Sequence, residues 1–445
     1  MTGRTPGPAD IRGWLDDHVN LETGVGVPAA SSRRATAPTL DRIRSLLQYL
    51  GDPQLEYPAI HVTGTNGKTS AARMITTLLE TIGASTGAYT SPHLERVNER
   101  ITWRGEAIGD DDLDELLRVV ALAEGAMDDR PSYFEVLTGA AYRWFADVAV
   151  DVAVVEVGVG GTWDATNVLD APVALVTNVS IDHVEYLGPT REQIAAEKAG
   201  IVHPDATLVL GEPDPDLEHL FTDRSPGRVL RRDRDFGVRA NTLAVGGRVV
   251  DLYTPTGRYD DVFVSLHGAH QADNAAAALA AVEAFTGERT DDHVVRAALG
   301  AARSPGRLEV VGRQPLVVLD GAHNVAGAHA LRAALDEEFA SSSRTLVVGL
   351  LREKDPHEML TALGIDDVAQ IVCCRPPSPR ALDPELVANA ATDLGVPDDR
   401  VEVVDTVTQA VGLAIASTPA DGQIVVTGSL YVVGAARARL TSGRV

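Results

Sequence analysis

The feature that most constrains the fold is a glycine-rich loop between an apolar run and a helical pattern. The apolar run is Ala59–Val62, the loop Gly64–Ser70 reads G-T-N-G-K-T-S, and the helical pattern Ala71–Ile82 ends at Gly83. A strand, such a loop and a helix together bind polyphosphates, because backbone N–H groups and the helix N-terminus face the anion. We predict a phosphate loop in which Lys68 reaches the outer phosphates and a hydroxyl meets Mg²⁺. The alternative is a glycine-rich turn with a surface lysine.

Lysine is rare in this chain. Of 39 lysine and arginine residues only three are lysine, at Lys68, Lys198 and Lys354. A lysine in an arginine-rich chain indicates a position that needs a compact ammonium or a deprotonatable amine. Lys198 lies in an apolar stretch, E-K-A-G-I, and a neutral amine there can add CO₂ to form a carboxylate-like carbamate. We also expect Lys354 to face a ligand crevice, because it follows a strand of the second half.

Composition limits the class of protein. A chain of 445 residues is expected to form about two domains, and its 44% hydrophobic and 23% charged residues are typical of a soluble globular protein. No apolar run reaches membrane-spanning length, and Met1–Asp10 lacks a signal-peptide pattern. The adjacent Cys373 and Cys374 cannot crosslink distant segments. With a net charge of −24, these features predict a cytoplasmic protein that binds neither membranes nor nucleic acids.

Polar residues follow the predicted buried strands of the first half. The valine-rich run Val148–Val157 predicts a strand of a parallel sheet, and Glu156 lies at its end, where open α/β sheets bind ligands. Glu156 is therefore a candidate Mg²⁺-binding acid, or else a carboxylate paired with a core arginine. Ser91 precedes a proline in extended or turn backbone, so its hydroxyl either points inward or belongs to a plain turn. His183, taken alone, fits an ordinary core or turn histidine.

Further helices and loops complete the first half. Thr190 begins a capping-box pattern before the helix that carries Lys198. Asn274 begins an alanine-rich helix, as its cap or as a base-binding amide. Residues 207–265 look irregular apart from two short strand patterns. The segments that we expect here are a loop at Gly24–Pro38, a helix at Leu40–Leu50, two helical patterns within 110–146, strands at Val173–Val176, Leu208–Leu210 and Val262–Leu266, and helices at Ala275–Phe285 and Asp291–Ala301.

A breaker-rich joint at Ser304–Arg307 separates the first half from a new β/α series. This alternation predicts a second, smaller, doubly wound domain at 304–445 after a domain at 1–303. Its first strand ends at Asp320, close to His323. The predicted strands are Leu316–Leu319, Thr345–Gly349, Gln370–Cys373, Val401–Val404 and Gln423–Thr427, and the predicted helices lie near Gly327–Phe339, Met359–Leu363, Pro384–Leu394 and Val407–Ile415.

Taken in order, the motifs of the chain resemble those of one family. They are T-G-T-N-G-K-T-S, S-P-H-L with N-E-R-I, F-E-x-L-T, E-V-G-x-G-G-x-x-D-A-T-N, D-H-x-x-x-L-G-x-T with E-K-A-G-I, H-Q-x-x-N, P-G-R-L-E, L-D-G-A-H-N and, at Thr427–Tyr431, T-G-S-L-Y. The series, spanning positions 61 to 434, is similar to folylpolyglutamate synthase/dihydrofolate synthase, a family of Mur-type ATP-dependent amide ligases. The resemblance implies an α/β fold with a Mur-ligase-like P-loop ATPase domain and a Rossmann-like C-terminal domain.

The resemblance also assigns site residues. ATP would contact Gly64, Thr65, Asn66, Gly67, Lys68, Thr69, Ser70, Asn274, Arg307 and Asp320. Two Mg²⁺ would be bound by Ser91, Glu156, His183 and a carbamate formed from CO₂ on Lys198. The pteroate would contact Ser132, Tyr133, Phe134, Glu135, Trp163, Asp164 and Ala165. Lys68, Lys198 and His323 would take part in catalysis.

The activity implied is addition of L-glutamate to a folate or pteroate carboxylate through an acyl phosphate, by a monomer. Three positions depart from the family pattern: Thr162 and Trp163 replace an arginine and a leucine, and Thr69 replaces a frequent glycine. These departures bear on the acceptor and leave the ligase chemistry unchanged. The alternatives are a Mur-type ligase with another acceptor, such as a cell-wall precursor or a peptide, and a nucleotide-binding module without ligase activity.

Overall fold

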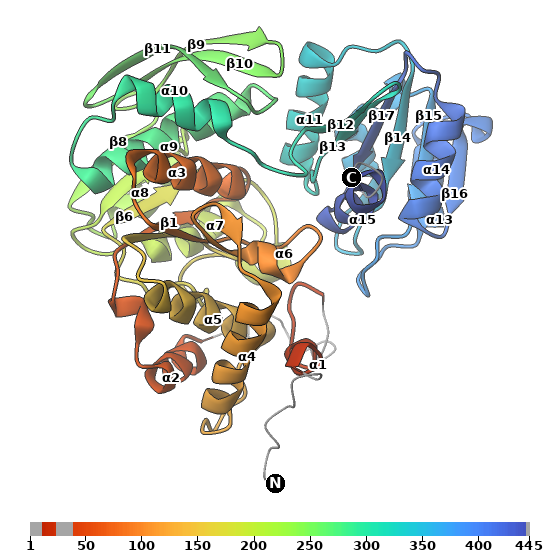
Figure 1. Ribbon diagram of the computed structural model, residues 1–445. Coiled ribbons are helices and arrows are strands. Elements are labelled where there is room, and N and C mark those ends of the chain that lie inside the picture. The colour runs from red at the N-terminus through yellow and green to blue at the C-terminus, as the bar shows by residue number, and fades with distance from the viewer. Residues whose placement is uncertain (1–10, 24–38, 442–445) are drawn as a thin grey trace. The chain divides into compact units, whose positions relative to one another are not determined.

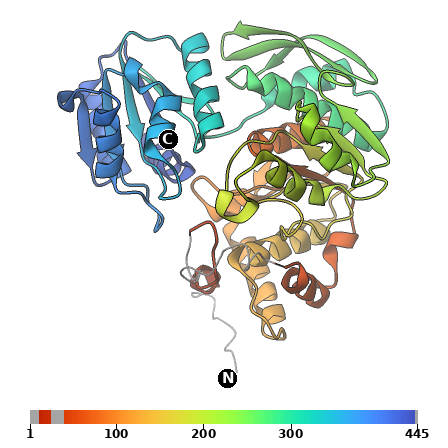
Figure 2. The ribbon, with the colours of Figure 1, turned by 180° about the vertical axis from the view of Figure 1, so that it is seen from behind.

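The computed structural model describes residues 11–23 and 39–441, so the expectations for Met1–Asp10 and Gly24–Pro38 lie outside the described residues. The chain divides into two compact units, which are described separately (Figures 1 and 2). The first unit comprises the described residues up to Thr242 with Val249–Ser265 and Gln271–Arg303. The second comprises Leu243–Arg248, Leu266–His270 and the chain from Ser304 onward. Two short segments before residue 304 thus belong to the second unit.

The first unit is built on an eight-stranded sheet of order β4-β3-β2-β5-β1-β6-β7-β8. Strands β2, β5, β1, β6, β7 and β8 are parallel, and β3 and β4 pair in antiparallel fashion at one edge. The carboxyl ends of the parallel strands therefore share one edge, where ligands of open α/β sheets bind. The strands are β1 (Ala59–Thr63), β2 (Thr86–Tyr89), β3 (Ile101–Trp103), β4 (Glu106–Ala107), β5 (Val152–Glu156), β6 (Val173–Val176), β7 (Thr207–Leu210) and β8 (Arg228–Arg231).

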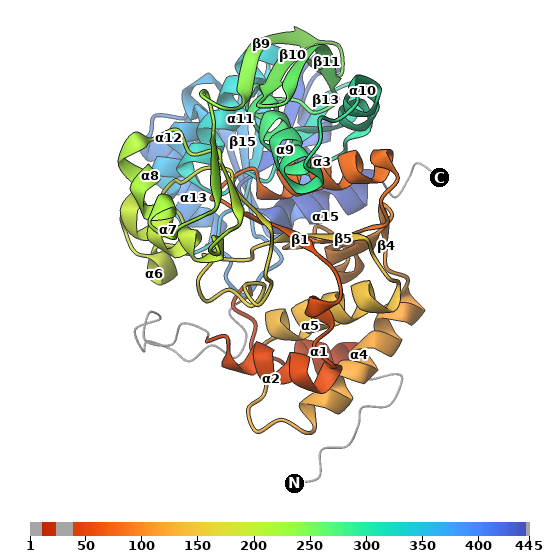
Figure 3. The same ribbon diagram turned by 90° about the vertical axis from the view of Figure 1, so that its left-hand side faces the viewer.

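Helices of the first unit cover this sheet. Helices α1, α2, α4 and α5 pack on one another around a common apolar core, and Figure 3 shows them grouped together. The helices are α1 (Ile11–Asp16), α2 (Asp41–Leu50), α3 (Lys68–Ile82), α4 (Asp110–Glu124), α5 (Tyr133–Asp147), α6 (Val184–Leu187), α7 (Arg191–Lys198), α8 (Pro215–Thr222), α9 (His270–Thr286) and α10 (Asp292–Ala301). The apolar residues of α3 at helical spacing are buried, and Gly83 ends the helix in a left-handed conformation, as the sequence predicts.

Two expectations for the first unit are wrong. The strand expected from Val148 begins only at Val152, because Val148 closes α5 and Ala149 has a positive φ. The segment 207–265, expected to be irregular, contains α8 and a regular sheet of order β11-β10-β9. Strands β9 (Gly237–Ala244), β10 (Gly247–Thr254) and β11 (Gly257–Val264) are joined by two-residue turns. Exposed charged and polar residues occupy one face of this sheet, which weakens its hydrophobic pattern.

The second unit is a six-stranded sheet of order β12-β13-β17-β14-β15-β16. All neighbours are parallel except β12 and β13. Helix α15 and the antiparallel edge strand β12 are additions to the predicted β/α series. The strands are β12 (Glu309–Arg313), β13 (Leu316–Leu319), β14 (Arg344–Val348), β15 (Gln370–Cys374), β16 (Val401–Val404) and β17 (Gln423–Thr427), and the helices are α11 (Val325–Glu338), α12 (Pro356–Leu363), α13 (Pro384–Asp393), α14 (Val407–Ser417) and α15 (Leu430–Thr441).

The short segments 243–248 and 266–270 are tied to the second unit through Glu338 at the end of α11. Its carboxylate accepts from Arg248 Nη1 at 2.6 Å, from the Gly268 backbone N–H at 2.8 Å and from His267 Nδ1 at 2.8 Å. These bonds join segments about 70 to 90 residues apart in the sequence. No helix within 11–23 and 39–441 is both long and apolar enough to span a lipid bilayer.

Candidate functional site

The loop after β1 has the geometry of a phosphate-binding loop. Helix α3 begins at Lys68, earlier than predicted, so its first N–H groups follow the loop directly. Gly64 and Gly67 have φ values of 147° and 82°. A Cβ on Gly64 would lie 1.8 Å from Thr177 Oγ1, and one on Gly67 would lie 2.6 Å from Asn274 Oδ1. Both positions therefore require glycine, for conformation and for space.

The segment after β6 holds the loop in place. The Asn66 carbonyl accepts from Thr177 Oγ1 at 2.7 Å and from Asn178 Nδ2 at 3.0 Å, while Asn66 N–H donates to Asn178 Oδ1 at 3.0 Å. The Thr65 N–H donates to the Asn178 carbonyl at 2.9 Å. We assigned no role to Thr177 and Asn178 from the sequence. Their position directly after β6 could have indicated a role at the loop, because β6 pairs with β1.

Two of the three lysines converge on one carbonyl oxygen. Lys68 Nζ donates to Gly64 O at 3.0 Å and to Thr65 O at 3.2 Å, and Lys198 Nζ donates to the same Gly64 O at 2.9 Å. Lys198 is buried at the end of α7. Burial, and then the charge of Lys68, lower the pKa of Lys198 to about 7. A substantial fraction of this amine is therefore neutral near pH 7.

Close backbone packing brings Lys198 to the loop. A Cβ on Gly161 would lie 2.7 Å from Glu197 O and 2.9 Å from Lys198 O. The Thr162 N–H donates to Glu197 O at 3.0 Å, and the Thr162 hydroxyl donates to the same oxygen at 3.1 Å. The glycine loop after β5 thus lies directly against the end of α7. Thr162, which replaces the arginine of the family pattern, belongs to this contact.

Glu156, at the carboxyl end of β5, faces the start of α3. Its Oε1 accepts from Thr69 Oγ1 at 2.9 Å, and its Oε2 accepts from Ser91 N at 3.4 Å. All of Thr69, Glu156 and Ser91 offer oxygen atoms, the ligand type that Mg²⁺ prefers. The structure thus brings together two of the predicted metal ligands, Glu156 and Ser91, beside a hydroxyl of the phosphate loop.

His183, the third predicted metal ligand, is the residue before α6, with a positive φ of 50°. Its backbone N–H donates to Asp182 Oδ1 at 2.8 Å. The buried Asp182 carboxylate acts on Lys198 to raise its pKa, against the effect of burial, and we did not single it out from the sequence. In the part of the chain that the structure describes, no group of three or more His, Cys, Asp or Glu side chains is placed to bind a metal. The predicted set contains only Glu156 and His183 of those types.

The predicted pteroate segment at the start of α5 is also a helix cap. Ser132 N–H donates to Glu135 Oε2 at 2.7 Å, and Glu135 N–H donates to Ser132 Oγ at 3.3 Å. Arg42 Nε donates to the same Glu135 oxygen at 3.1 Å. The buried Tyr133 ring faces the Arg100 guanidinium at 5.7 Å. Ser132, Tyr133 and Glu135 thus fix the start of α5.

The second predicted pteroate segment is organised by Asp164. This buried carboxylate accepts from Val159 N at 3.0 Å, Thr166 N at 3.0 Å and Thr166 Oγ1 at 2.5 Å. Burial raises its pKa, and these hydrogen bonds act in the opposite direction. Thr166 Oγ1 is also 2.8 Å from Nε2 of the buried His61, which anchors the loop to β1. Ala165 belongs to the core.

Two half-buried aromatic rings flank the glycines of this loop. Phe134 Cζ lies 2.7 Å from the position of a Cβ on Gly158, and Trp163 Cζ2 lies 3.4 Å from the position of one on Gly160. The Phe134 ring also packs at 5.9 Å from Tyr89. Of the predicted pteroate residues, Phe134 and Trp163 have rings that are partly accessible. Each of these rings lies beside a glycine.

Asn274 does not cap its helix, contrary to one of the two interpretations. Helix α9 begins at His270, so Asn274 lies in its second turn, and its Nδ2 donates to Gln271 Oε1 at 3.0 Å. Its Oδ1 lies against Gly67 of the phosphate loop. The structure thus places this side chain at the loop.

The remaining predicted residues gather within the second unit, where β13 ends. Asp320 accepts from Leu308 N at 2.8 Å and from Ala322 N at 2.9 Å. Burial raises the pKa of Asp320, and the nearby Arg307 acts to lower it. His323 Nδ1 is 2.8 Å from Gly321 O. Arg307, Asp320 and His323 therefore form one cluster, at the carboxyl end of a parallel strand.

Comparisons with known proteins identify the family to which the chain belongs. Residues 126–282 match the domain family described as "Mur ligase middle domain", and residues 306–430 match the family described as "Mur ligase, glutamate ligase domain". The fold and the phosphate loop therefore define a Mur-type ligase. The chain is 43% identical to the dihydrofolate synthase/folylpolyglutamate synthase of Mycobacterium tuberculosis, over 90% of this chain and 89% of that protein. It belongs to the folylpolyglutamate synthase/dihydrofolate synthase family.

Solved structures show the same relationship. The Mycobacterium tuberculosis folylpolyglutamate synthase complexed with ADP superposes with a TM-score of 0.89 at 40% identity, covering 97% of this chain and 98% of that one. The structure described as E. coli FolC in complex with DHPP and ADP has a TM-score of 0.86 at 28% identity and covers 100% of both chains. The prediction of an α/β Mur-ligase fold and of the family is confirmed.

Proposed function

We propose that this protein joins L-glutamate to a carboxylate of a dihydropteroate or folate, using ATP, through an acyl phosphate. The observation that carries the proposal is the convergence of Lys68 and Lys198 on Gly64 O, next to the Thr69–Glu156 pair. This arrangement offers positive charge and oxygen ligands where a terminal phosphoryl group would lie. Relatives named for both dihydrofolate synthase and folylpolyglutamate synthase activities support the same substrates.

The chemistry proceeds in two steps. A substrate carboxylate oxygen attacks the γ-phosphorus of ATP, which breaks the bond to ADP and gives an acyl phosphate. The neutral amino group of glutamate then attacks the acyl carbon and expels phosphate, with loss of a proton from the nitrogen. Lys68 and the N–H groups at the start of α3 stabilise charge on the transferring phosphoryl group. This stabilisation depends on position, and the bonds from Thr177 and Asn178 hold the loop in place.

We include Mg²⁺ in this proposal, with Ser91, Glu156, His183 and a Lys198 carbamate as the groups that would hold it. The Glu156 carboxylate accepts from the Ser91 backbone N–H and from the Thr69 hydroxyl, so residues with oxygen-bearing side chains, the ligands of a hard cation, meet at the loop. When bound, Mg²⁺ supplies neutralisation of phosphate charge. The burial of Lys198 and its pKa of about 7 favour the neutral amine that carbamate formation requires. Lys68, which shares the Gly64 oxygen with Lys198, is placed to pair with the resulting negative charge.

For the acceptor we propose that the rings of Phe134 and Trp163 contact the pteroate. Ser132, Tyr133, Glu135, Asp164 and Ala165 support them by fixing the start of α5 and the loop after β5. A half-buried aromatic surface next to glycines suits a flat heterocycle. Within the first unit we propose Asn274 as an ATP contact, because it lies at the phosphate loop. Within the second unit we propose Arg307 and Asp320 as nucleotide contacts and His323 as a catalytic residue. We further expect a cytoplasmic monomer.

The test is release of ADP in a coupled assay in which each substrate is omitted in turn. We expect release only when ATP, glutamate and a pteroate or folate are all present. Release that needs glutamate but accepts another carboxylate would favour a Mur-type ligase with a different acceptor. Nucleotide binding without release under any combination would favour a binding module. Comparing dihydropteroate with a monoglutamyl folate then separates dihydrofolate synthase activity from polyglutamylation.

A further inference from the structure

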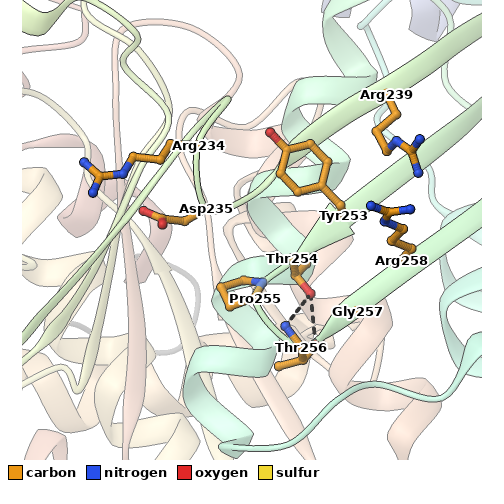
Figure 4. A pocket seen from close by; sticks show the side chains of 9 residues that line it. All are labelled: Arg234, Asp235, Arg239, Tyr253, Thr254, Pro255, Thr256, Gly257 and Arg258. Carbon is orange, nitrogen blue, oxygen red and sulfur yellow. Dashed lines mark hydrogen bonds between the residues drawn. The ribbon is translucent and has the colours of Figure 1, made fainter.

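A concave site lies in the first unit, and its lining includes no residue of the phosphate loop or of the predicted pteroate segments. A hollow of about 630 Å³ is formed between the loop after β8 and the sheet β9–β11 (Figure 4). The side chains that line it are Arg234, Asp235, Arg239, Tyr253, Thr254, Pro255, Thr256, Gly257 and Arg258. The lining thus contains three arginines, one tyrosine and a single carboxylate, in a protein with a net charge of −24.

The three arginines of this hollow lack acidic partners. Many other arginines among the described residues pair with a carboxylate, as Arg289 does with Asp292 at 2.6 Å. Within 11–23 and 39–441, the guanidinium groups of Arg234, Arg239 and Arg258 form no ion pair or side-chain hydrogen bond. Figure 4 shows the guanidinium groups of Arg239 and Arg258 next to each other, on one side of the Tyr253 ring. Two like charges at such a position repel each other unless an anion lies between them.

Hydrogen bonds to neighbouring segments hold several residues that line the hollow. Thr254 Oγ1 is 2.9 Å from Thr256 Oγ1, and Thr256 Oγ1 donates to Glu283 Oε2 of α9 at 2.6 Å. On the opposite wall, the one carboxylate of the hollow, Asp235, accepts from the Arg231 backbone N–H at 2.9 Å. The turn between β10 and β11 and the loop after β8 therefore have fixed conformations, and the arginines project from rigid elements. A site on rigid elements loses less entropy when it binds a ligand.

The hollow also lies at the ligand-binding edge of the large sheet. Strand β8 is separated from β1 by two strands, so its carboxyl end lies roughly 14 Å from the phosphate loop along the same edge. Arg232, two residues before Arg234, pairs with Asp273 at 3.5 Å, and the next residue, Asn274, contacts Gly67. The hollow thus neighbours the nucleotide-binding loop without sharing a residue with it.

We propose that this hollow, the arginine pocket, binds a small anion with two or more oxyanion groups, held between Arg239 and Arg258 with Arg234 opposite. Guanidinium groups bind carboxylate and phosphate oxygens in the same bidentate manner, so the ligand is either an oligocarboxylate or an oligophosphate. The oligocarboxylate source rests on the proposed function, whose product would carry one more carboxylate after each glutamate addition. The oligophosphate source is independent of that function.

The test is isothermal titration calorimetry of the full chain with Mg-ADP present at saturation, so that the phosphate loop is already filled. The two probes are tri-γ-glutamate and pyrophosphate. The Arg239→Ala/Arg258→Ala double variant removes the paired guanidiniums. Arg228→Ala is the matched control, because Arg228 is exposed on β8, outside the pocket, and also forms no ion pair among the residues described.

We expect one probe to bind the wild-type chain, with a Kd at least about tenfold higher in the double variant, which corresponds to ~1.4 kcal/mol. Arg228→Ala should bind as the wild type does, and ATP-dependent ligation of a first glutamate should be unchanged in both variants. The probe that binds identifies the source of the ligand. Binding of neither probe, or equal weakening in Arg228→Ala and in the double variant, would overturn the proposal. Since binding is measured without turnover, loss of the ligase function would leave this result unchanged.

Discussion

Replacing Lys198 by methionine should stabilise the protein while it abolishes ligation. The folded protein holds this buried amine with a pKa of about 7, against an ordinary value of 10.5. Each pKa unit corresponds to 1.36 kcal/mol, so keeping the amine buried costs on the order of 4–5 kcal/mol below pH 7. The bond from Lys198 to Gly64 O returns about 1 kcal/mol, and Lys68 still donates to that oxygen after the substitution. We expect Lys198→Met to gain roughly 3 kcal/mol at pH 7.

This gain should shrink as pH rises. Between about pH 7 and 10.5 the unfolded chain keeps the proton that the folded chain has released, so wild-type stability increases with pH. The difference between variant and wild type should fall by about 2 kcal/mol from pH 7 to pH 9. Urea unfolding in CO₂-free buffer at both pH values measures this, with Lys354→Met as the matched lysine-to-methionine control. A destabilised Lys198→Met, or a difference independent of pH, would refute the reasoning.

Three further predictions follow from the same site. Lys68→Ala should lose ATP turnover by the equivalent of roughly 3–4 kcal/mol with an unchanged melting temperature, and near-normal turnover in the folded variant would contradict its role. Activity should fall in CO₂-free buffer, most at low pH, and acetate should partly rescue Lys198→Ala but not Lys198→Arg; full activity without CO₂ would argue against the carbamate. The isolated fragment 1–303, which lacks most of the second unit, should bind nucleotide weakly and ligate nothing, and measurable ligation by it would show that residues 304–445 are dispensable.

The central strand, loop and helix were predictable because their signal is local. Glycines with a positive φ, a buried apolar run and helical spacing all lie within about 25 residues, from Ala59 to Gly83. The same holds for the β/α series of the second unit, where each buried strand is an apolar run. Most of the sheet β9–β11 was missed, since the predicted strand Val262–Leu266 overlaps only the end of β11. Charged residues on the exposed face interrupt the pattern, and two-residue turns leave little loop sequence between the strands.

Contacts between segments far apart in the chain could not be predicted from the sequence in the same way. Asn274 looked like a helix cap because nothing in its neighbourhood indicates that α9 starts at His270. Thr177 and Asn178 are ordinary polar residues until the pairing of β6 with β1 places them at the phosphate loop. The clamp of Arg248 and His267 on Glu338 joins residues about 70 to 90 positions apart. Contacts of this kind depend on the topology of the fold, which cannot be derived from local patterns in a single sequence.

The acyl phosphate is the central claim, and oxygen transfer tests it most directly. A folate or dihydropteroate labelled with ¹⁸O in the reacting carboxylate is incubated with the protein, ATP and glutamate, and the released phosphate is analysed by mass spectrometry. If the carboxylate oxygen attacks the γ-phosphorus, one labelled oxygen appears in the phosphate for each amide bond formed. Amide product accompanied by unlabelled phosphate would contradict the proposed route, because the phosphate would then have taken its oxygen from water.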